Sequence, residues 1–210
     1  TTTRDNSSYF ARTWYATHPS SKNEYGFRER EFSAEKPEDV YRIAVIGDSL
    51  TFGQGIDESD RFSNRLERYL NQSPGRYQVL NFGRAGAETV DEIDILERYV
   101  LGASPDFVLL QWYTNDVEGH ESLKKRPLRP LPSKFLTSYL HRHSALYYLL
   151  NNWWQSLQGS LGLIENHDDY MIRRFGNPDS PPSQAAASAL QQFFQVAKSH
   201  GIPVGAVMFP

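Results

Sequence analysis

The sequence contains no cysteine, which excludes disulfide bonds and thiolate metal sites. It has no apolar run near the roughly 20 residues that span a bilayer, and its first five residues do not form a secretory signal. A surplus of positive charge is missing as well, because the formal net charge is -3 at pH 7. Since proteins hold polyanions through clusters of basic residues that release counterions, we expect no nucleic-acid partner.

Patterns that bind phosphates or metals are also missing. The stretch from Gly47 to Gly55 contains three glycines, but the chain has neither a Gly-Lys-Ser/Thr ending there nor a Gly-x-Gly-x-x-Gly run. His141-x-His143, considered together with the aspartates at 168–169, lacks a recognised metal-ligand spacing. The basic run at 124–129 lies among prolines and is typical of a solvated loop. We therefore expect no metal and no cofactor.

The composition is that of an ordinary globular domain, with 210 residues, 39% hydrophobic and 22% charged. Residues 1–38 show no sustained helical or strand period, so we expect an N-terminal arm followed by one domain over 39–210. The chain starts without methionine, which is compatible with a processed or trimmed protein that has lost an upstream signal or anchor. The cellular compartment stays open.

Short apolar runs alternate with segments of helical spacing. Such alternation predicts right-handed crossovers and a parallel sheet, and therefore a three-layer, flavodoxin-like α/β fold. A proline-rich loop and an aromatic helical stretch at 135–157 interrupt the alternation, so we expect a helical cap inserted at about 117–182. This cap is a packing element, a lid over a pocket or a membrane-facing surface. The expected strands are 41–46, 77–82, 106–112 and 202–209, and the expected helices of the domain are 59–70, 89–101 and 184–200.

The motif Gly47-Asp48-Ser49-Leu50 follows the first expected strand directly. Functional side chains of parallel sheets gather beyond the carboxyl ends of the strands, so Ser49 stands where a nucleophile would be useful. Ser49 is also expected to open a helix, whose free N–H groups favour an oxyanion. The simpler interpretation is that Asp48 and Ser49 only cap that helix, as aspartate and serine often do.

Two further polar segments follow the next two expected strands. The first is Asn81-Phe82-Gly83-Arg84-Ala85-Gly86, in which glycine allows close backbone approach to a ligand. The second is Thr114-Asn115-Asp116, in which Asn115 can supply an amide donor. Each segment alone is a common turn device. Their repetition at the ends of consecutive strands favours a shared site.

These segments resemble those of the SGNH hydrolases, also called GDSL esterases and lipases, clearly over residues 39–117 and loosely over 184–210. The resemblance implies that Ser49 is the nucleophile of a serine ester hydrolase. It implies an oxyanion hole formed by the Ser49 backbone N–H, Gly86 and Asn115, with Gly83 as the alternative to Gly86. Asp48 and Asp116 are supporting residues.

The sequence departs from the family pattern at two places. Tyr113 stands where the third block usually has glycine, which alters the expected pocket shape. More seriously, none of the six histidines has an aspartate three residues before it, whereas the family's last block is Asp-x-x-His. We expect this block to lie beyond residue 210 in a C-terminally truncated chain. His120 is the internal alternative as a base, and His18, His167 and His200 have no supporting neighbours.

The reaction implied by the resemblance is acyl transfer from a small-molecule or carbohydrate ester, including carbohydrate O-acetyl esters. Water as the acceptor makes an esterase, and a sugar hydroxyl makes an O-acyltransferase. The alternative from a different class is a catalytically inactive SGNH-like binding module. Membrane contact is neither supported nor excluded by the sequence.

Overall fold

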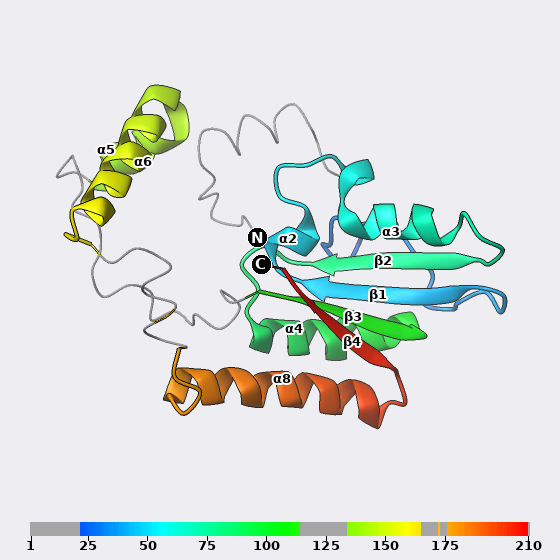
Figure 1. The fold of residues 1–210 in the computed structure, drawn as a ribbon. Coiled ribbons are helices and arrows are strands. Elements are labelled where there is room, and N and C mark those ends of the chain that lie inside the picture. The colour runs from blue at the N-terminus through cyan, green and yellow to red at the C-terminus, as the bar shows by residue number, and fades with distance from the viewer. Residues whose placement is uncertain (1–21, 114–133, 165–171, 173–175, 210) are drawn as a thin grey trace. The chain divides into compact units, whose positions relative to one another are not determined.

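The structure is a computed structural model that describes residues 22–113, 134–164, 172 and 176–209. The chain divides into two compact units, one formed by 20–120 and 177–210, the other by 1–19 and 121–176. The first unit contains the sheet and Ser49, and the second contains two helices of the expected cap (Figure 1).

The first unit is built on a four-stranded parallel sheet in the order β2-β1-β3-β4. This order confirms the flavodoxin-like α/β architecture expected from the alternation of strands and helices. The register pairs Ile46 with both Phe82 and Leu110, so the carboxyl ends of the three strands lie at one edge. The strands are β1 (Tyr41–Gly47), β2 (Tyr77–Gly83), β3 (Phe107–Trp112) and β4 (Val204–Met208).

Helices cover both faces of this sheet (Figure 1). On one face lie α2 (Ser49–Phe52) and α3 (Phe62–Leu70), which both contact β2. On the other lie α4 (Thr89–Ile95) and α8 (Pro181–Ser199), which pack against each other. The main apolar core forms on the α4 and α8 face, because alternate strand residues point there. Its fully buried members include Ala44, Ile46, Leu80, Phe82, Val108, Leu110, Leu96 and Phe193.

The helix boundaries differ from the expected ones where capping decides them. Ser180 accepts a hydrogen bond from the Ser183 N–H and is followed by two prolines, so α8 begins at Pro181 and not at residue 184. The stretch expected as a single helix at 135–157 forms α5 (Lys134–His143) and α6 (Ala145–Ser160). They are separated at Ser144, whose hydroxyl accepts from the Tyr147 N–H. Both helices fall inside the expected cap, and their role as a cap stays a prediction.

The outer edge of β2 is occupied by side chains along its length. Four of its backbone N–H groups donate to side-chain oxygens at 2.6–3.0 Å. One of these acceptors is Glu29, which lies in the described part of the expected arm, residues 22–38. That part forms turns and contains neither helix nor strand. The donor and acceptor pairs are Tyr77 with Asn71, Val79 with Glu67, Asn81 with Glu29, and Gly83 with Asn81.

Candidate active site

Ser49 is the first residue of α2, immediately after β1 and Asp48. Asp48 is buried and caps the helix, because its Oδ1 accepts from the Leu50 N–H at 2.9 Å. Its Oδ2 lies 3.4 Å from the Ser49 hydroxyl, which donates to it. Ser49 itself is only partly buried. The aspartate therefore holds the turn while the serine stays partly exposed.

Two glycines allow this turn to lie directly against the sheet. A Cβ at Gly47 would come within 2.3 Å of the Thr51 hydroxyl, and a Cβ at Gly83 within 2.2 Å of the Phe52 backbone nitrogen. The loop after β2 is joined to the end of β1 by a 3.0 Å hydrogen bond from the Arg84 N–H to the Gly47 carbonyl. The turns that carry Ser49 and Gly86 are thus adjacent in the fold.

The two glycines considered for the oxyanion hole differ in how their N–H groups are used. The Gly83 N–H already donates to the Asn81 side chain at 2.9 Å. Gly86 is exposed, has a φ of 79° in the left-handed region, and its N–H has no acceptor among the described residues. The Ser49 N–H likewise has no acceptor in this part of the chain. The backbone N–H groups of Gly86 and Ser49 can therefore donate hydrogen bonds to a ligand oxygen.

The remaining predicted site residues, Asn115 and Asp116, lie outside the described residues, as does His120. The strand that leads to them, β3, ends at Trp112 at the same edge of the sheet as Gly47 and Gly83. Of the described histidines, His200 lies in the same unit as Ser49, and the Ser49 hydroxyl does not bond to it. His200 bonds instead to the Val196 carbonyl near the end of α8.

Asn81, expected only as the start of a glycine turn, is a fully buried bridge between β2 and the helices above it. Its amide nitrogen donates to the Thr51 carbonyl at 2.6 Å and to the Ser63 hydroxyl at 2.7 Å. A buried amide with all these partners fixes the position of α2 relative to α3. The asparagine is therefore structural support for the Ser49 turn.

Sequence reasoning missed a group of buried charged residues beside this bridge. Glu29 and Arg61 lie 3.9 Å apart and are both buried, and Arg61 also pairs with Glu58 at 3.3 Å. Burial raises the pKa of Glu29, against the lowering effects of two backbone N–H groups and the Arg61 charge. Burial lowers the pKa of Arg61, with Glu29 and Glu58 opposing it. No sequence period marks these residues. Glu and Arg are also rarely buried, so their place inside the fold could not be expected from the sequence.

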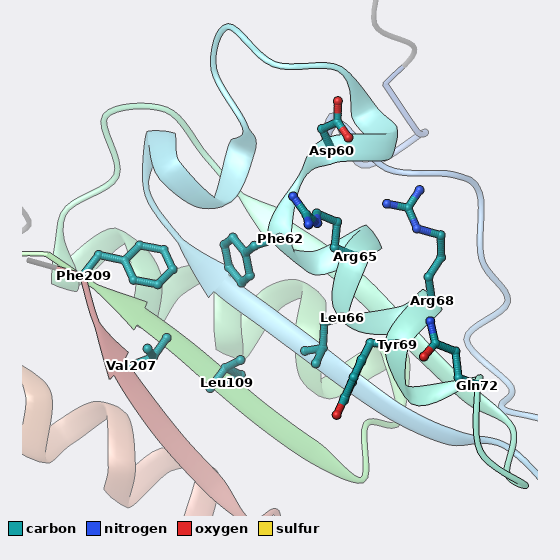
Figure 2. A pocket seen from close by; sticks show the side chains of 10 residues that line it. All are labelled: Asp60, Phe62, Arg65, Leu66, Arg68, Tyr69, Gln72, Leu109, Val207 and Phe209. Atoms are coloured by element: carbon teal, nitrogen blue, oxygen red, sulfur yellow. The ribbon is translucent and has the colours of Figure 1, made fainter.

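A separate open pocket of about 780 Å³ lies on the α3 face of the sheet (Figure 2). Its walls are mainly apolar side chains from α3, β3 and β4, so α3 does not cover this part of the sheet completely. Neither Ser49 nor Gly86 lines it. Its lining residues include Phe62, Leu66, Tyr69, Leu109, Val207 and Phe209, with Arg65 and Arg68 at its rim (Figure 2).

The sequence profile of the GDSL-like Lipase/Acylhydrolase family matches residues 45–207, from β1 to β4. The chain belongs to this family. Among solved structures, this GDSL-like protein is similar to a SGNH-hydrolase family esterase, with 17% identity, TM-score 0.36, and coverage of 80% of this chain and 77% of that one. No match was found among curated proteins.

Two further similar structures come from named bacteria. One is a variant of an acetyl xylan esterase from Geobacillus stearothermophilus, with 16% identity, TM-score 0.36, and coverage of 78% of the GDSL-like chain and 75% of the esterase. The other is a member of the lipolytic protein G-D-S-L family from Veillonella parvula DSM 2008, with 15% identity, TM-score 0.33, and coverage of 78% and 76%.

The described part of the GDSL-like protein contains no cluster of three or more histidine, aspartate or glutamate side chains placed to hold a metal ion. Within the same residues, every helix is too short or too polar to cross a membrane.

Proposed function

We propose that this member of the GDSL-like lipase/acylhydrolase family is a serine ester hydrolase with Ser49 as its nucleophile. The observation that carries the proposal is the position of Ser49, partly exposed at the carboxyl edge of a parallel sheet and held by a buried capping aspartate. The turn that contains Gly86 is bonded to the end of the same strand. A nucleophile and an unused backbone donor are thus supplied by adjacent turns.

In the proposed reaction, the Ser49 oxygen forms a bond to the carbonyl carbon of a carboxylic ester, and its proton passes to a base. The N–H groups of Ser49 and Gly86, with the Asn115 side chain, donate to the oxyanion that develops. The carbon–oxygen bond to the leaving alcohol then breaks, and the proton from the base completes that alcohol. Water attacks the acyl-enzyme in the same way and releases the acid.

A serine hydroxyl is a weak nucleophile without a base, and the base is the part of the proposal that is not assigned to a residue of the described chain. No histidine of the chain stands in an Asp-x-x-His motif. The Asp48 carboxylate bonds to the hydroxyl, but it also caps α2, and we assign it a supporting role. We propose a carboxylic ester substrate, including carbohydrate O-acetyl esters, with O-acyl transfer to a sugar hydroxyl as the alternative outcome of the same acyl-enzyme.

The second candidate, from a different class, is an SGNH-like binding module that has the fold without the base. The two candidates differ in the reactivity of Ser49. A fluorophosphonate probe attaches covalently to an activated serine, and mass spectrometry identifies the labelled residue. We expect slow labelling of Ser49 that free imidazole accelerates by acting as a base.

The Ser49→Ala variant should lose this labelling and serves as the control. Labelling at another serine with Ser49 unmodified would show that the nucleophile is assigned wrongly. An unreactive Ser49, even with imidazole, would favour the binding module.

A further inference from the structure

The helix that carries Ser49 is a single turn of four residues, Ser49–Phe52. One turn fixes several backbone angles for one hydrogen bond, so it is unstable in isolation. Its carbonyl groups also lack partners within the helix. The geometry of the Ser49 turn therefore depends on groups outside it, and Asp48 accounts only for the N-terminal end.

At the carbonyl end, Asn81 donates to the Thr51 carbonyl, and the guanidinium of Arg28 holds the carbonyls that follow. Its Nη1 donates to the Gly53 carbonyl at 2.6 Å and lies 3.5 Å from the Phe52 carbonyl, and its Nη2 donates to the Ile56 carbonyl at 2.9 Å. The guanidinium also lies over the Phe52 ring, 5.9 Å from its centre. Arg28 is only 2% exposed. A buried cation at the carbonyl end of a helix is a favourable arrangement.

Arg28 is itself held by the segment around it. The preceding residue, Phe27, is 2% exposed and packs edge-to-face against Phe82 and Tyr99. The Arg28 carbonyl accepts from the buried Arg61 guanidinium. The side of Gly53 that faces these groups is closed, because a Cβ there would lie 2.5 Å from the Arg61 side chain and 3.4 Å from Arg28 Nη1. These contacts fix the backbone of Arg28 independently of the bonds that its guanidinium makes to the turn.

We propose that Arg28 is a positioning residue for Ser49, acting through the carbonyl end of α2. This inference rests on the proposed function, since it assigns the arginine a role in the reactivity of that serine. The guanidinium holds the end of the turn opposite Asp48, and the two together set the direction of the Ser49 hydroxyl. The described part of the N-terminal arm thereby belongs to the active-site support.

The test compares Arg28→Met, which keeps the aliphatic stem, with Arg28→Lys, which keeps the charge, and with Arg30→Met as the matched control. Arg30 lies two residues away and pairs with Glu67 on the surface, without contact to α2. Two quantities are measured in each folded variant: the rate of fluorophosphonate labelling at Ser49 in imidazole, and hydrogen exchange of the backbone amides. The diagnostic amides are Phe52, Gly53 and Gln54, which bond to the Asp48 and Ser49 carbonyls at 2.9–3.1 Å.

We expect Arg28→Met to slow labelling about 10- to 100-fold, since small displacements of a reacting group have effects of this size. Exchange should accelerate at the Phe52, Gly53 and Gln54 amides and stay unchanged in β3. The labelling and exchange rates of Arg28→Lys should lie between those of Arg28→Met and the wild type. Those of Arg30→Met should match the wild type. Low millimolar guanidinium should restore part of the labelling rate of Arg28→Met by replacing the missing group. A labelling rate lowered by general loss of stability would not be restored in this way.

Wild-type labelling in folded Arg28→Met, or unchanged exchange at the Phe52, Gly53 and Gln54 amides, would overturn the inference. If Arg28→Met does not fold, wild-type values of both quantities in Arg28→Lys would overturn it instead. If Ser49 is unreactive in the wild type, the proposed function fails and the positioning role fails with it. The exchange data then show only whether Arg28 holds the turn.

Discussion

The Thr51 hydroxyl donates a 2.7 Å hydrogen bond to the Gln111 side chain, and both residues are fully buried. This bond joins the turn that carries Ser49 to β3, a central strand of the sheet. Both side chains crowd Gly47, where a Cβ would lie 2.3 Å from the Thr51 oxygen and 2.7 Å from the Gln111 oxygen. The Ser49 turn is therefore anchored to the centre of the sheet as well as to its β2 edge.

We expect Thr51→Val to lower the free energy of unfolding by about 1–3 kcal/mol, because it leaves the buried Gln111 oxygen without a donor. Thr51→Ser, which keeps the hydroxyl, should lose less. Adding Gln111→Met to Thr51→Val should recover part of the loss, since replacing both partners removes the unsatisfied group. Urea unfolding of the four proteins measures these differences. A double variant less stable than Thr51→Val would contradict the argument.

Gly83→Ala tests the close contact between β2 and α2. The added methyl group would lie 2.2 Å from the Phe52 backbone nitrogen, so one element must shift. We expect a loss of about 1–3 kcal/mol, typical of overpacking, together with slower labelling of Ser49. Gly102→Ala is the matched control, because an added Cβ meets nothing within 4 Å there. Thermal unfolding should show Gly102→Ala to be neutral or stabilising. Equal losses of stability in both variants would contradict the role of the close contact at Gly83.

Asp106→Asn should destabilise the protein in a pH-dependent way. Partial burial acts to raise the pKa of Asp106, but the Lys36 ammonium and the Arg42 N–H outweigh it, so its pKa lies below the usual value. A lowered pKa means that the carboxylate stabilises the fold above its usual pKa and that this effect is lost as pH falls through the folded-state value.

The difference in unfolding free energy between wild type and Asp106→Asn should therefore be largest near pH 7 and shrink in acid. Denaturant unfolding at several pH values measures it. Asp94→Asn removes a surface ion pair with Arg98 and should have a smaller effect at pH 7. A constant difference across the acidic range would contradict the assignment.

If the protein hydrolyses esters as proposed, Asn115→Ala should lower kcat by about 10²-fold with little change in KM, because an oxyanion donor acts mainly in the transition state. The variant should fold normally, as circular dichroism can check. Steady-state hydrolysis of a p-nitrophenyl ester measures both constants. A wild-type kcat would mean that Asn115 has only a structural role.

Much of the fold could be predicted because strand and helix periods are local. The run ending at Gly47 identified β1, and the glycine loop from Asn81 identified the end of β2. The boundary of α8 could also have been found, since Ser180 followed by two prolines is a strong helix-start pattern. The alanine-rich stretch instead indicated a start at residue 184.

The supports of the site could not be predicted in the same way. Arg28 and Glu29 belong to a segment without period, and their burial depends on partners 25 and 52 residues away in the sequence. Only the assembled fold brings an arginine to the end of α2. The proposed nucleophile was indicated by a local motif, whereas the residues that hold its turn are brought together only by tertiary contacts.

The side chains along the outer edge of β2 have a consequence for self-association. An exposed strand edge is a template on which another chain can add a strand and begin to aggregate. Here Asn71, Glu67, Glu29 and Asn81 already accept from the N–H groups that an incoming strand would need. Intermolecular sheet growth is thereby blocked on this side, and the opposite edge, at β4, is where the sheet of the first unit can accept another strand.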